Sequence, residues 1–537
     1  MNNLQPHHGK GIGSQQLVLT LLIPCVYLVY HHVLFPLFRR DLRTIPGPFL
    51  AKITDLYRLF IVRTGSAHEY HIRLHERHGP FVRLGPNNVS VGSPAAIPVL
   101  YNARTRFPKS DFYPVMGNVA RGKVVPTIFS TLDESVHESM KRPIAQVYAM
   151  TSLQTYEPLV ESTETLFFRK LEKLVEEERS FDLGTWLHWF ATDVIMEITF
   201  GKRVGFLERE EDVDGILATI EKRFWYVAVT GQLPWLDKLF HKNSLITFLS
   251  GLWWKQKISP VLRFTLDQIE ERKRARQGNP EKKGQERDFL SRFLDIQDGR
   301  PDIPDFWIIS WCQQNVQAGS ESTAITLTSV IYHLLKTPDS MQMLLAELNN
   351  ANLPSPIPWD MAHKLPCLDS CIKEALRMTP AIGIPLERVA PPEGIELSGK
   401  YFEPGTVLGV NAWVVHRDQQ VFGVDAASWR PERWIEAGPD ARKAMERALF
   451  AFGGGSRVCL GKNISYLEMY KVIPELLTRF KVCYFRFNRF DLSVHTYDPT
   501  PIQFELTNPR REWSVKNGFF TYTKGVEVKI QKRTSSD

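Results

Sequence analysis

Residues 452–461, FGGGSRVCLG, combine three consecutive glycines, an arginine and a cysteine directly before a helical pattern. Glycine adopts backbone conformations with positive φ and lets the chain lie against a flat ligand. Cys459 would stand at the N-terminal end of the following helix, where backbone N–H groups and the helix dipole stabilise a thiolate. Such a thiolate is a soft ligand for iron. A buried structural cysteine beside an ordinary turn fits equally well, and the local chemistry does not separate the two interpretations.

A phosphate-binding loop is excluded for this glycine-rich stretch. The pattern G-x-x-x-x-G-K-[ST] would need glycine at position 456 and serine or threonine at position 463. The sequence has Ser456 and Asn463 instead. Two essential positions are therefore missing.

The order of these residues resembles the haem-binding loop of the cytochrome P450 monooxygenases, F-x-x-G-x-R-x-C-x-G. Every fixed position is filled, by Phe452, Gly455, Arg457, Cys459 and Gly461. The resemblance implies that Cys459 is the thiolate ligand of the iron of haem b. It also implies that Arg457 pairs with a haem propionate and that Phe452 packs beside the thiolate.

Residues 306–336 read as one long helix that ends before a Thr-Pro pair. Its middle, AGSEST at 318–323, contains a glycine and adjacent serines, which predict either local distortion or a packing notch. The sequence resembles the family pattern A-G-x-[D/E]-T-[T/S], which implies that Glu321, Ser322 and Thr323 line the oxygen pocket and deliver protons. Ser322 replaces the usual threonine and lacks its methyl group and its stiffness at χ1. We expect less efficient coupling rather than loss of activity.

Further basic residues resemble those that hold the haem propionates in this family. His137 and Lys141 lie four residues apart on one helical face and can converge on one anion. Without the resemblance, a solvated basic face would be the better interpretation. Arg388 ends the stretch PLER, which is similar to the family strand whose arginine contacts the second propionate.

Glu374 and Arg377, three residues apart, can pair on one helical face. The stretch PER at 431–433 follows, as it does in the family. The resemblance implies a buried Glu374–Arg377–Arg433 triad behind the haem.

A zinc site formed by His363, Cys367 and Cys371 is the alternative for this part of the chain. These residues are spaced like ligands on a helix, but no fourth ligand lies nearby in the sequence. Two small thiols on a core helix are the more ordinary interpretation.

The composition of the 537 residues indicates a large globular domain. The hydrophobic content of 43% is sufficient for a large core. No repeat or low-complexity linker divides the chain. The net charge of +7 is too diffuse to argue for nucleic acid. Six cysteines without framework spacing indicate a reducing compartment.

The N-terminal region predicts a membrane anchor. Residues 11–38 contain no Asp, Glu, Lys or Arg, and residues 17–38 are mostly apolar and long enough to cross a bilayer. A cleaved signal peptide is the alternative, but no alanine precedes Ala51, so an A-x-A cleavage site is absent. The arginines that follow place the catalytic body in the cytosol. The predicted regions are a short lumenal segment 1–16, a transmembrane signal anchor 17–38, a basic, proline-rich hinge 39–50 and a catalytic domain 51–537.

The resemblance covers residues 45–530 and implies a mainly α fold with small β sheets, one of which the alternating residues 81–91 also predict. It further implies a single-pass enzyme of the endoplasmic reticulum membrane, similar to the fungal microsomal pisatin demethylase group. Such an enzyme uses O2 to oxidise a small, largely apolar molecule in secondary metabolism or detoxification. The C-terminal tail, through Phe519 and Phe520, reads as β hairpins, which in the family contribute to the substrate pocket.

Electrons would come from NADPH through a separate NADPH–cytochrome P450 reductase, alone or together with cytochrome b5, because the chain has no flavin or nucleotide module of its own. Lys462 and Arg142 are the expected contacts for that reductase. Two alternatives stay open. One is a haem-thiolate isomerase or dehydratase that works without external electrons, and the other is a haem sensor or carrier.

Overall fold

The computed structural model describes residues 39–120, 123–243, 258–278, 288–481, 505–506, 512–529 and 531–532, together with positions 22 and 26. The predicted lumenal segment 1–16 lies outside the described residues. So does the predicted anchor 17–38, except for positions 22 and 26. In the described part of the chain, no helix combines the length and apolar composition needed to span a membrane.

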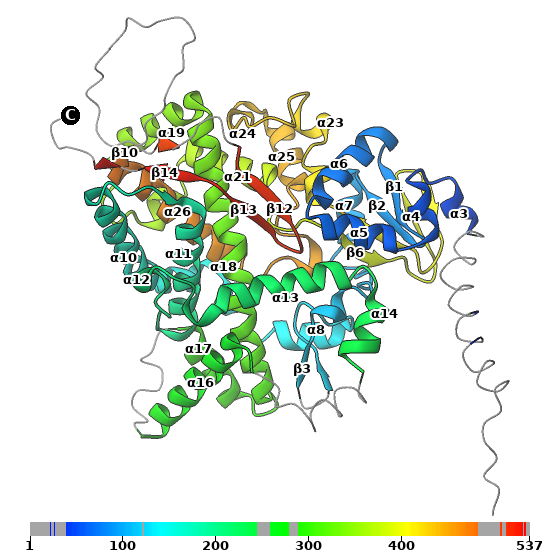
Figure 1. Ribbon diagram of the computed structural model, residues 1–537, viewed down its shortest axis with the longest axis horizontal. Coiled ribbons are helices and arrows are strands. Elements are labelled where there is room, and N and C mark those ends of the chain that lie inside the picture. The colour runs from blue at the N-terminus through cyan, green and yellow to red at the C-terminus, as the bar shows by residue number, and fades with distance from the viewer. Residues whose placement is uncertain are drawn as a thin grey trace, which may run out of the picture.

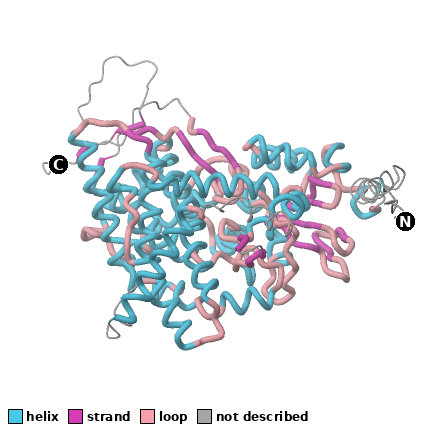
Figure 2. The backbone as a smooth tube through the Cα atoms, turned by 60° about the horizontal axis from the view of Figure 1, so that its bottom comes forward, coloured by secondary structure: helices cyan, strands magenta, loops and turns pink. Residues whose placement is uncertain are grey.

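The fold is mainly helical with small β sheets, as the sequence predicts (Figures 1 and 2). The largest sheet has the strand order β1-β2-β9-β6. It lies with the helices from α3 (Arg40–Arg43) to α7 (Ile97–Leu100) at one end of the molecule. The helices α10 (Glu157–Glu176), α11 (Leu183–Phe200) and α12 (Phe206–Arg209) lie at the other end (Figure 1). Its strands are β1 (Phe81–Gly85), β2 (Asn88–Val91), β9 (Val407–Val410) and β6 (Leu386–Val389).

The strands of this sheet pair in both parallel and antiparallel directions. β1 pairs antiparallel with β2, β2 parallel with β9, and β9 antiparallel with β6. All five residues of β1 are buried, because helices and the N-terminal segment cover the sheet. The pairing of Arg388 with Leu408 fixes the position of Arg388 on β6.

The helix α18 (Asp305–Lys336) runs through the helical part of the molecule. The helices packed against it include α11 (Leu183–Phe200), α16 (Pro260–Gly278), α21 (Pro366–Met378) and α26 (Lys462–Arg479). Its bounds match the predicted helix at 306–336.

The expected distortion in the middle of α18 is wrong, because the helix is continuous. The serine hydroxyls donate within the helix, Ser320 to the carbonyl of Val316 at 3.0 Å and Ser322 to that of Ala318 at 2.7 Å. Gly319 instead allows a close approach of α11. A Cβ atom there would lie 2.9 Å from Cγ1 of Ile195.

The predicted hinge belongs to the folded body, at least over residues 39–48. Leu42 and Ile45 are completely buried in the core beside the sheet. The N–H of Arg83 on β1 donates to the carbonyl of Pro46 at 2.8 Å. Arg39 forms an ion pair with Asp41 at 2.8 Å. The apolar and polar contacts together attach this segment to the sheet.

The remaining elements surround this framework. The N-terminal helices include α3 (Arg40–Arg43), α4 (Phe49–Ile53), α5 (Leu56–Thr64), α6 (Ala67–His78) and α7 (Ile97–Leu100). Later in the chain come α8 (Glu134–Lys141), α10 (Glu157–Glu176), α12 (Phe206–Arg209), α13 (Ile216–Thr230) and α14 (Pro234–Leu236). The short helices α20 (Trp359–Ala362) and α24 (Glu432–Glu436) follow α18. The smaller sheets include the hairpin β12 (Ser514–Asn517) and β13 (Thr521–Lys524), the hairpin β3 (Asn118–Ala120) and β4 (Lys123–Val125), and the set β11 (Glu505–Leu506), β14 (Glu527–Lys529) and β5 (Phe181–Asp182).

Candidate active site

The cysteine loop precedes α26 and is shaped by its glycines. Gly453 and Gly455 have φ values of +69° and +64°, in the left-handed region that favours glycine. A Cβ atom on Gly455 would lie 2.0 Å from the carbonyl oxygen of Tyr101, so a side chain cannot fit there. The N–H of Cys459 donates to the carbonyl of Phe452 at 2.9 Å and closes the loop.

The Cys459 side chain is accessible, yet its sulfur lies among groups that favour a thiolate. Burial raises the pKa of the thiol above its ordinary value, and the backbone N–H groups of Gly461 and Lys462 and the ammonium groups of Lys141 and Lys462 offset only part of this rise. The helix α26 begins at Lys462, so these N–H groups are those of its N-terminal end. A sulfur in this setting is suited to bind a metal cation, whose own charge displaces the thiol proton.

The predicted propionate-binding residues converge beside the loop, around the carboxylate of Glu134. Arg457 donates to Oε2 of Glu134 through Nε at 2.9 Å and is paired with it through Nη2 at 2.7 Å. Nδ1 of His137 lies 3.0 Å from Oε1 of the same carboxylate. Lys141 donates to the carbonyl of Ser456 at 2.7 Å and thereby joins α8 to the cysteine loop.

Lys109 is a member of this cluster that sequence reasoning missed. Its ammonium group is buried, donates to the carbonyl of Phe129 at 2.6 Å, and lies 4.3 Å from the ring centres of both Tyr113 and Phe129. Burial, followed by the charges of Arg457 and Arg388, lowers the pKa of Lys109 well below its ordinary value. No sequence motif pointed to Lys109, because the charged residues around it in the fold, such as Arg388 and Arg457, are distant in sequence.

Arg388 completes the cluster from β6. Its guanidinium donates to the Tyr113 hydroxyl at 3.2 Å and lies 4.8 Å from the ring centre of Tyr101. Four cationic side chains from separate segments therefore act on one another here, those of Lys109, Lys141, Arg388 and Arg457. The Glu134 carboxylate offsets part of this charge. The positive charge that remains would be balanced by a cofactor with two carboxylates, such as haem with its two propionates.

The three residues predicted to line the oxygen pocket point in different directions. Glu321 is buried, and burial raises its pKa to about 8. Ser322 is half-exposed, and its hydroxyl donates within α18. The Thr323 hydroxyl is buried and lies 2.8 Å from that of Ser465 on α26. Ser322 is thus the accessible member, while Thr323 joins α18 to α26.

An aromatic cluster gathers side chains from the segment between β2 and α8, from α13 and from the β12–β13 hairpin. The ring centre of Phe519 lies 5.7 Å from that of Phe129, 5.6 Å from that of Phe224 and 6.2 Å from that of Phe112. Phe520 contacts Phe224 at 4.6 Å. The family resemblance places the hairpin that carries Phe519 and Phe520 at a substrate pocket. In the structure, this hairpin packs against the rings of Phe112, Phe129 and Phe224.

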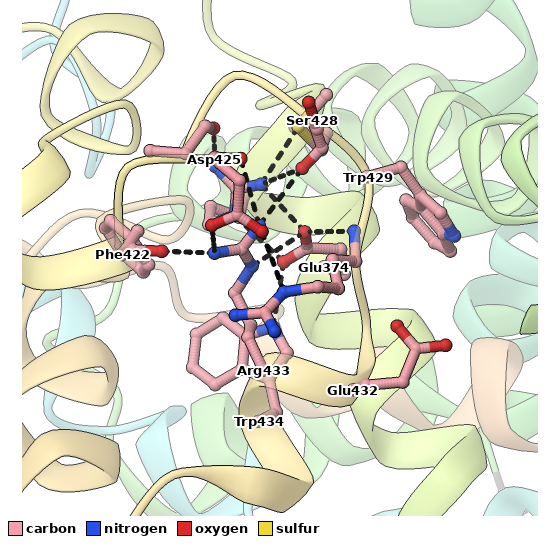
Figure 3. Close-up of polar contacts among 12 residues, drawn as sticks. Glu374, Phe422, Asp425, Ser428, Trp429, Glu432, Arg433 and Trp434 are labelled. Carbon is pink, nitrogen blue, oxygen red and sulfur yellow. Dashed lines mark hydrogen bonds and ion pairs between the residues drawn. The ribbon is translucent and has the colours of Figure 1, made fainter.

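The residues predicted as a charge triad are brought together in the core (Figure 3). Oε1 of Glu374 lies 2.7 Å from Nη2 of Arg377 and 3.1 Å from Nε of Arg433. Trp434 donates its indole N–H to Oε2 of Glu374 at 2.9 Å. Burial alone would raise the pKa of Glu374, but Arg377, Arg433 and the N–H of Arg430 hold it below its ordinary value.

His416 connects this triad to the cysteine loop and was not found from the sequence. Its Nδ1 lies 3.0 Å from the carbonyl of Arg377, and its Nε2 accepts the N–H of Phe450 at 2.8 Å. Nδ1 therefore carries the proton and donates to Arg377, and the imidazole is neutral. Burial and the neighbouring arginines lower the pKa of His416 to about 3.

We expect acid to destabilise the fold partly through His416. Its pKa in the folded chain lies below the ordinary 6.5, so protons favour the unfolded chain and the stabilisation is lost as pH falls from 6.5 towards 3. Replacing His416 with Gln should remove up to about 1.4 kcal/mol per pH unit from the acid-side slope of the unfolding free energy. Urea denaturation between pH 7 and 4 measures this slope. Parallel curves for the two proteins would contradict the assignment.

The zinc alternative is wrong. Cys371 is buried, Cys367 is half-buried, and His363 stacks on Trp359 with its Nδ1 2.7 Å from the carbonyl of Trp359. Within the ranges that the structure describes, no group of three or more His, Cys, Asp or Glu side chains is arranged to hold a metal ion.

Comparison with known proteins agrees with this fold and this loop. The sequence model of the family Cytochrome P450 matches residues 46–503. The chain is 41% identical over 500 residues to cytochrome P450 monooxygenase cicH of Emericella nidulans, which covers 92% of this chain and 95% of that protein. It is 40% identical to a cytochrome P450 monooxygenase of Aspergillus terreus, over 82% of this chain and 90% of the other. Identity to mpaDE of Penicillium brevicompactum is 41% and spans 91% of this chain but 55% of that longer protein.

The chain therefore belongs to the cytochrome P450 family. Within the family it is a cytochrome P450 monooxygenase of the fungal kind, and the resemblance seen in the sequence is confirmed. Membership implies haem with a cysteine thiolate ligand, and O2 as a reactant.

Proposed function

We propose that this chain is a membrane-bound haem-thiolate monooxygenase in which Cys459 is the ligand of the haem iron. The observation that carries this proposal is the accessible Cys459 sulfur beside a cluster of buried cations. When bound, haem with a thiolate ligand supplies O2 activation. The chain provides the ligand, the charges that orient the cofactor, a dry pocket and a source of protons.

The cation cluster would hold the propionates. Arg457, Lys141 and Arg388 are the charged donors predicted from the sequence, and His137 orients Glu134 among them. Lys109 is the added member. Phe452, Gly455 and Gly461 shape the loop that presents Cys459.

Replacing Lys109 with Met should weaken cofactor retention. A hydrogen bond to a charged group contributes about 1.5–3 kcal/mol, so haem should leave the variant roughly tenfold faster or more. Transfer of haem to excess apomyoglobin measures this rate. Lys238, an exposed lysine paired with Asp111 at 2.8 Å, provides the matched control as Lys238→Met. Equal transfer rates in all three proteins would remove Lys109 from the propionate site.

Glu321 and Ser322 would deliver protons to the reacting oxygen. Glu321 carries its proton at neutral pH, because its pKa is raised to about 8. Ser322 lies next to it in sequence on the accessible face of α18. Thr323 would act by holding α18 against α26 through Ser465.

The substrate would be a small, largely apolar molecule, because the aromatic cluster of Phe112, Phe129, Phe224, Phe519 and Phe520 offers ring contacts. Its oxidation would belong to secondary metabolism or detoxification. The electron source would be NADPH through the separate reductase, alone or together with cytochrome b5. Lys462 and Arg142 would contact the reductase on the side of the cysteine loop.

The anchor at 17–38 would hold the enzyme in the endoplasmic reticulum membrane, with residues 1–16 in the lumen and the catalytic domain in the cytosol. Exposed apolar side chains lie shortly after the anchor in the chain and support this location, since Phe49 and Phe60 on α4 and α5 are 74% and 65% exposed. Trp235 on α14 and Phe240 extend the exposed apolar set. Alkaline carbonate extraction and protease protection of microsomes test the anchor and its orientation.

The reaction class is tested by ¹⁸O2 turnover in membranes that contain the chain and the reductase. A monooxygenase consumes NADPH and places one labelled oxygen atom in the product. Conversion of a substrate without NADPH would identify an isomerase or dehydratase instead. Haem binding without either reaction would identify a sensor or carrier.

A further inference from the structure

The carboxyl group of Glu321 faces a histidine from a different helix. His188 lies on α11, and its Nε2 atom is 3.4 Å from Oε1 of Glu321. The two helices pack closely because Gly319 admits Ile195 of α11 against α18. The position of His188 opposite Glu321 is therefore fixed by the helix packing rather than by a loop.

The His188 side chain is buried at Nε2 but partly exposed to solvent elsewhere. Its Nε2 is buried and has no hydrogen-bond partner in the described part of the chain, although 21% of the side chain is exposed. Glu321, in contrast, is nearly inaccessible. At 3.4 Å the pair is close but not aligned as a hydrogen bond, and such pairs commonly tighten when a site is loaded.

Burial keeps both groups of the pair neutral. Burial lowers the pKa of His188 to about 4 against the opposing effect of Asp212. Burial, with a contribution from Glu221, raises the pKa of Glu321 to about 8. Tyr522 on β13, whose hydroxyl has no hydrogen-bond partner among the described residues, is a further titratable group that interacts with Glu321. At neutral pH the carboxyl group is therefore protonated and the imidazole is neutral.

We propose that His188 is the relay through which Glu321 regains its proton from solvent. Glu321 releases its proton towards Ser322 and becomes a carboxylate. The neutral ring of His188 starts with its proton on Nε2. Its Nδ1 takes a proton from solvent, and the resulting imidazolium gives its Nε2 proton to that carboxylate. The ring then returns to its starting tautomer by proton exchange with solvent. This inference rests on the proposed monooxygenase function, since it assigns the proton supply of the same site.

The pairing can be tested without turnover, by infrared spectroscopy of the purified full chain. A carboxyl group that shares a hydrogen bond with an imidazole absorbs at a lower wavenumber than one that does not. The Glu321 band is identified by its loss in Glu321→Gln. We expect His188→Phe to shift this band to higher wavenumber, whereas His188→Gln, which can still form a hydrogen bond, keeps it close to its original position.

His363→Gln is the matched control, because His363 lies just after α20 and contacts Trp359 rather than Glu321. It should leave the infrared band unchanged. An unshifted band in His188→Phe would overturn the proposal. Because this measurement needs neither reductase nor turnover, it gives an answer even if the monooxygenase function itself is wrong.

Proton supply is then measured as the rate of NADPH oxidation with reductase and O2, without added substrate, in H2O and D2O. General acid–base groups contribute about 10²–10⁴-fold to proton transfer, so both His188→Phe and His188→Gln should lower the rate at least tenfold and increase the solvent isotope effect. His363→Gln should match the parent. A shifted infrared band with an unchanged rate and isotope effect would show that His188 only positions Glu321, and would overturn the relay.

Discussion

Cys459→Ala should abolish the strongly red-shifted Soret band of the dithionite-reduced, CO-bound enzyme and all NADPH-dependent oxidation. The reason is that the thiolate is the ligand whose electron donation produces that spectrum and favours O–O cleavage. Alanine fits sterically in the loop, because the backbone contact from the N–H of Cys459 to Phe452 does not need the sulfur. The measurement is the CO difference spectrum of membranes carrying each protein.

Cys367→Ala provides the control for this experiment. Cys367 is a half-buried cysteine on α21, outside the loop. It should retain the parent spectrum. A red-shifted band that survives in Cys459→Ala would exclude Cys459 as the ligand. A parent enzyme with haem but without that band would mean a neutral thiol or a histidine ligand.

Glu374→Ala should yield no stable haem protein. The substitution leaves Arg377 and Arg433 buried without their shared carboxylate, and it also removes the acceptor for the indole of Trp434. Breaking a buried charge network in this way costs about 3–5 kcal/mol, which is a large part of the roughly 5–15 kcal/mol that stabilises a typical protein. Haem content per milligram of protein and the yield of soluble folded chain report the effect.

Glu432→Ala is the matched control for the triad. Glu432 stands one residue before Arg433, but Figure 3 shows its carboxylate turned away from Glu374. Its contact is with the hydroxyl of Ser340 at 3.2 Å. This variant should load haem normally. Recovery of Glu374→Ala with normal haem content would show that the triad is dispensable.

The features that sequence reasoning found are those encoded by local spacing. The Thr-Pro pair after residue 336 indicated the end of α18, and alternation indicated β1 and β2. The glycines of the cysteine loop were identified from their types, although the close contact of Gly455 with the Tyr101 carbonyl needed the fold. Glu374 and Arg377 could be paired from helical spacing, whereas Arg433 entered only through the family resemblance.

The features that sequence reasoning missed depend on long-range packing. Lys109, His188 and His416 each act on residues in distant segments, and no local pattern relates them to those partners. The direction of the Thr323 hydroxyl was also unpredictable, because it depends on how closely α26 approaches α18. The packing of residues 39–48 against the sheet was unpredictable for the same reason, since proline and basic residues look alike in a free linker and in a segment bound to a sheet.

The attachment of residues 39–48 to the sheet has a practical consequence for producing a soluble form. A truncation that starts at residue 39 keeps Leu42 and Ile45 in their buried positions and preserves the backbone contact between Arg83 and Pro46. A truncation at residue 51, chosen because the preceding segment looks like a linker, would uncover that part of the core and leave the N–H of Arg83 without its acceptor. A shortened chain for expression should therefore retain this segment, because it is a structural part of the enzyme rather than a tether.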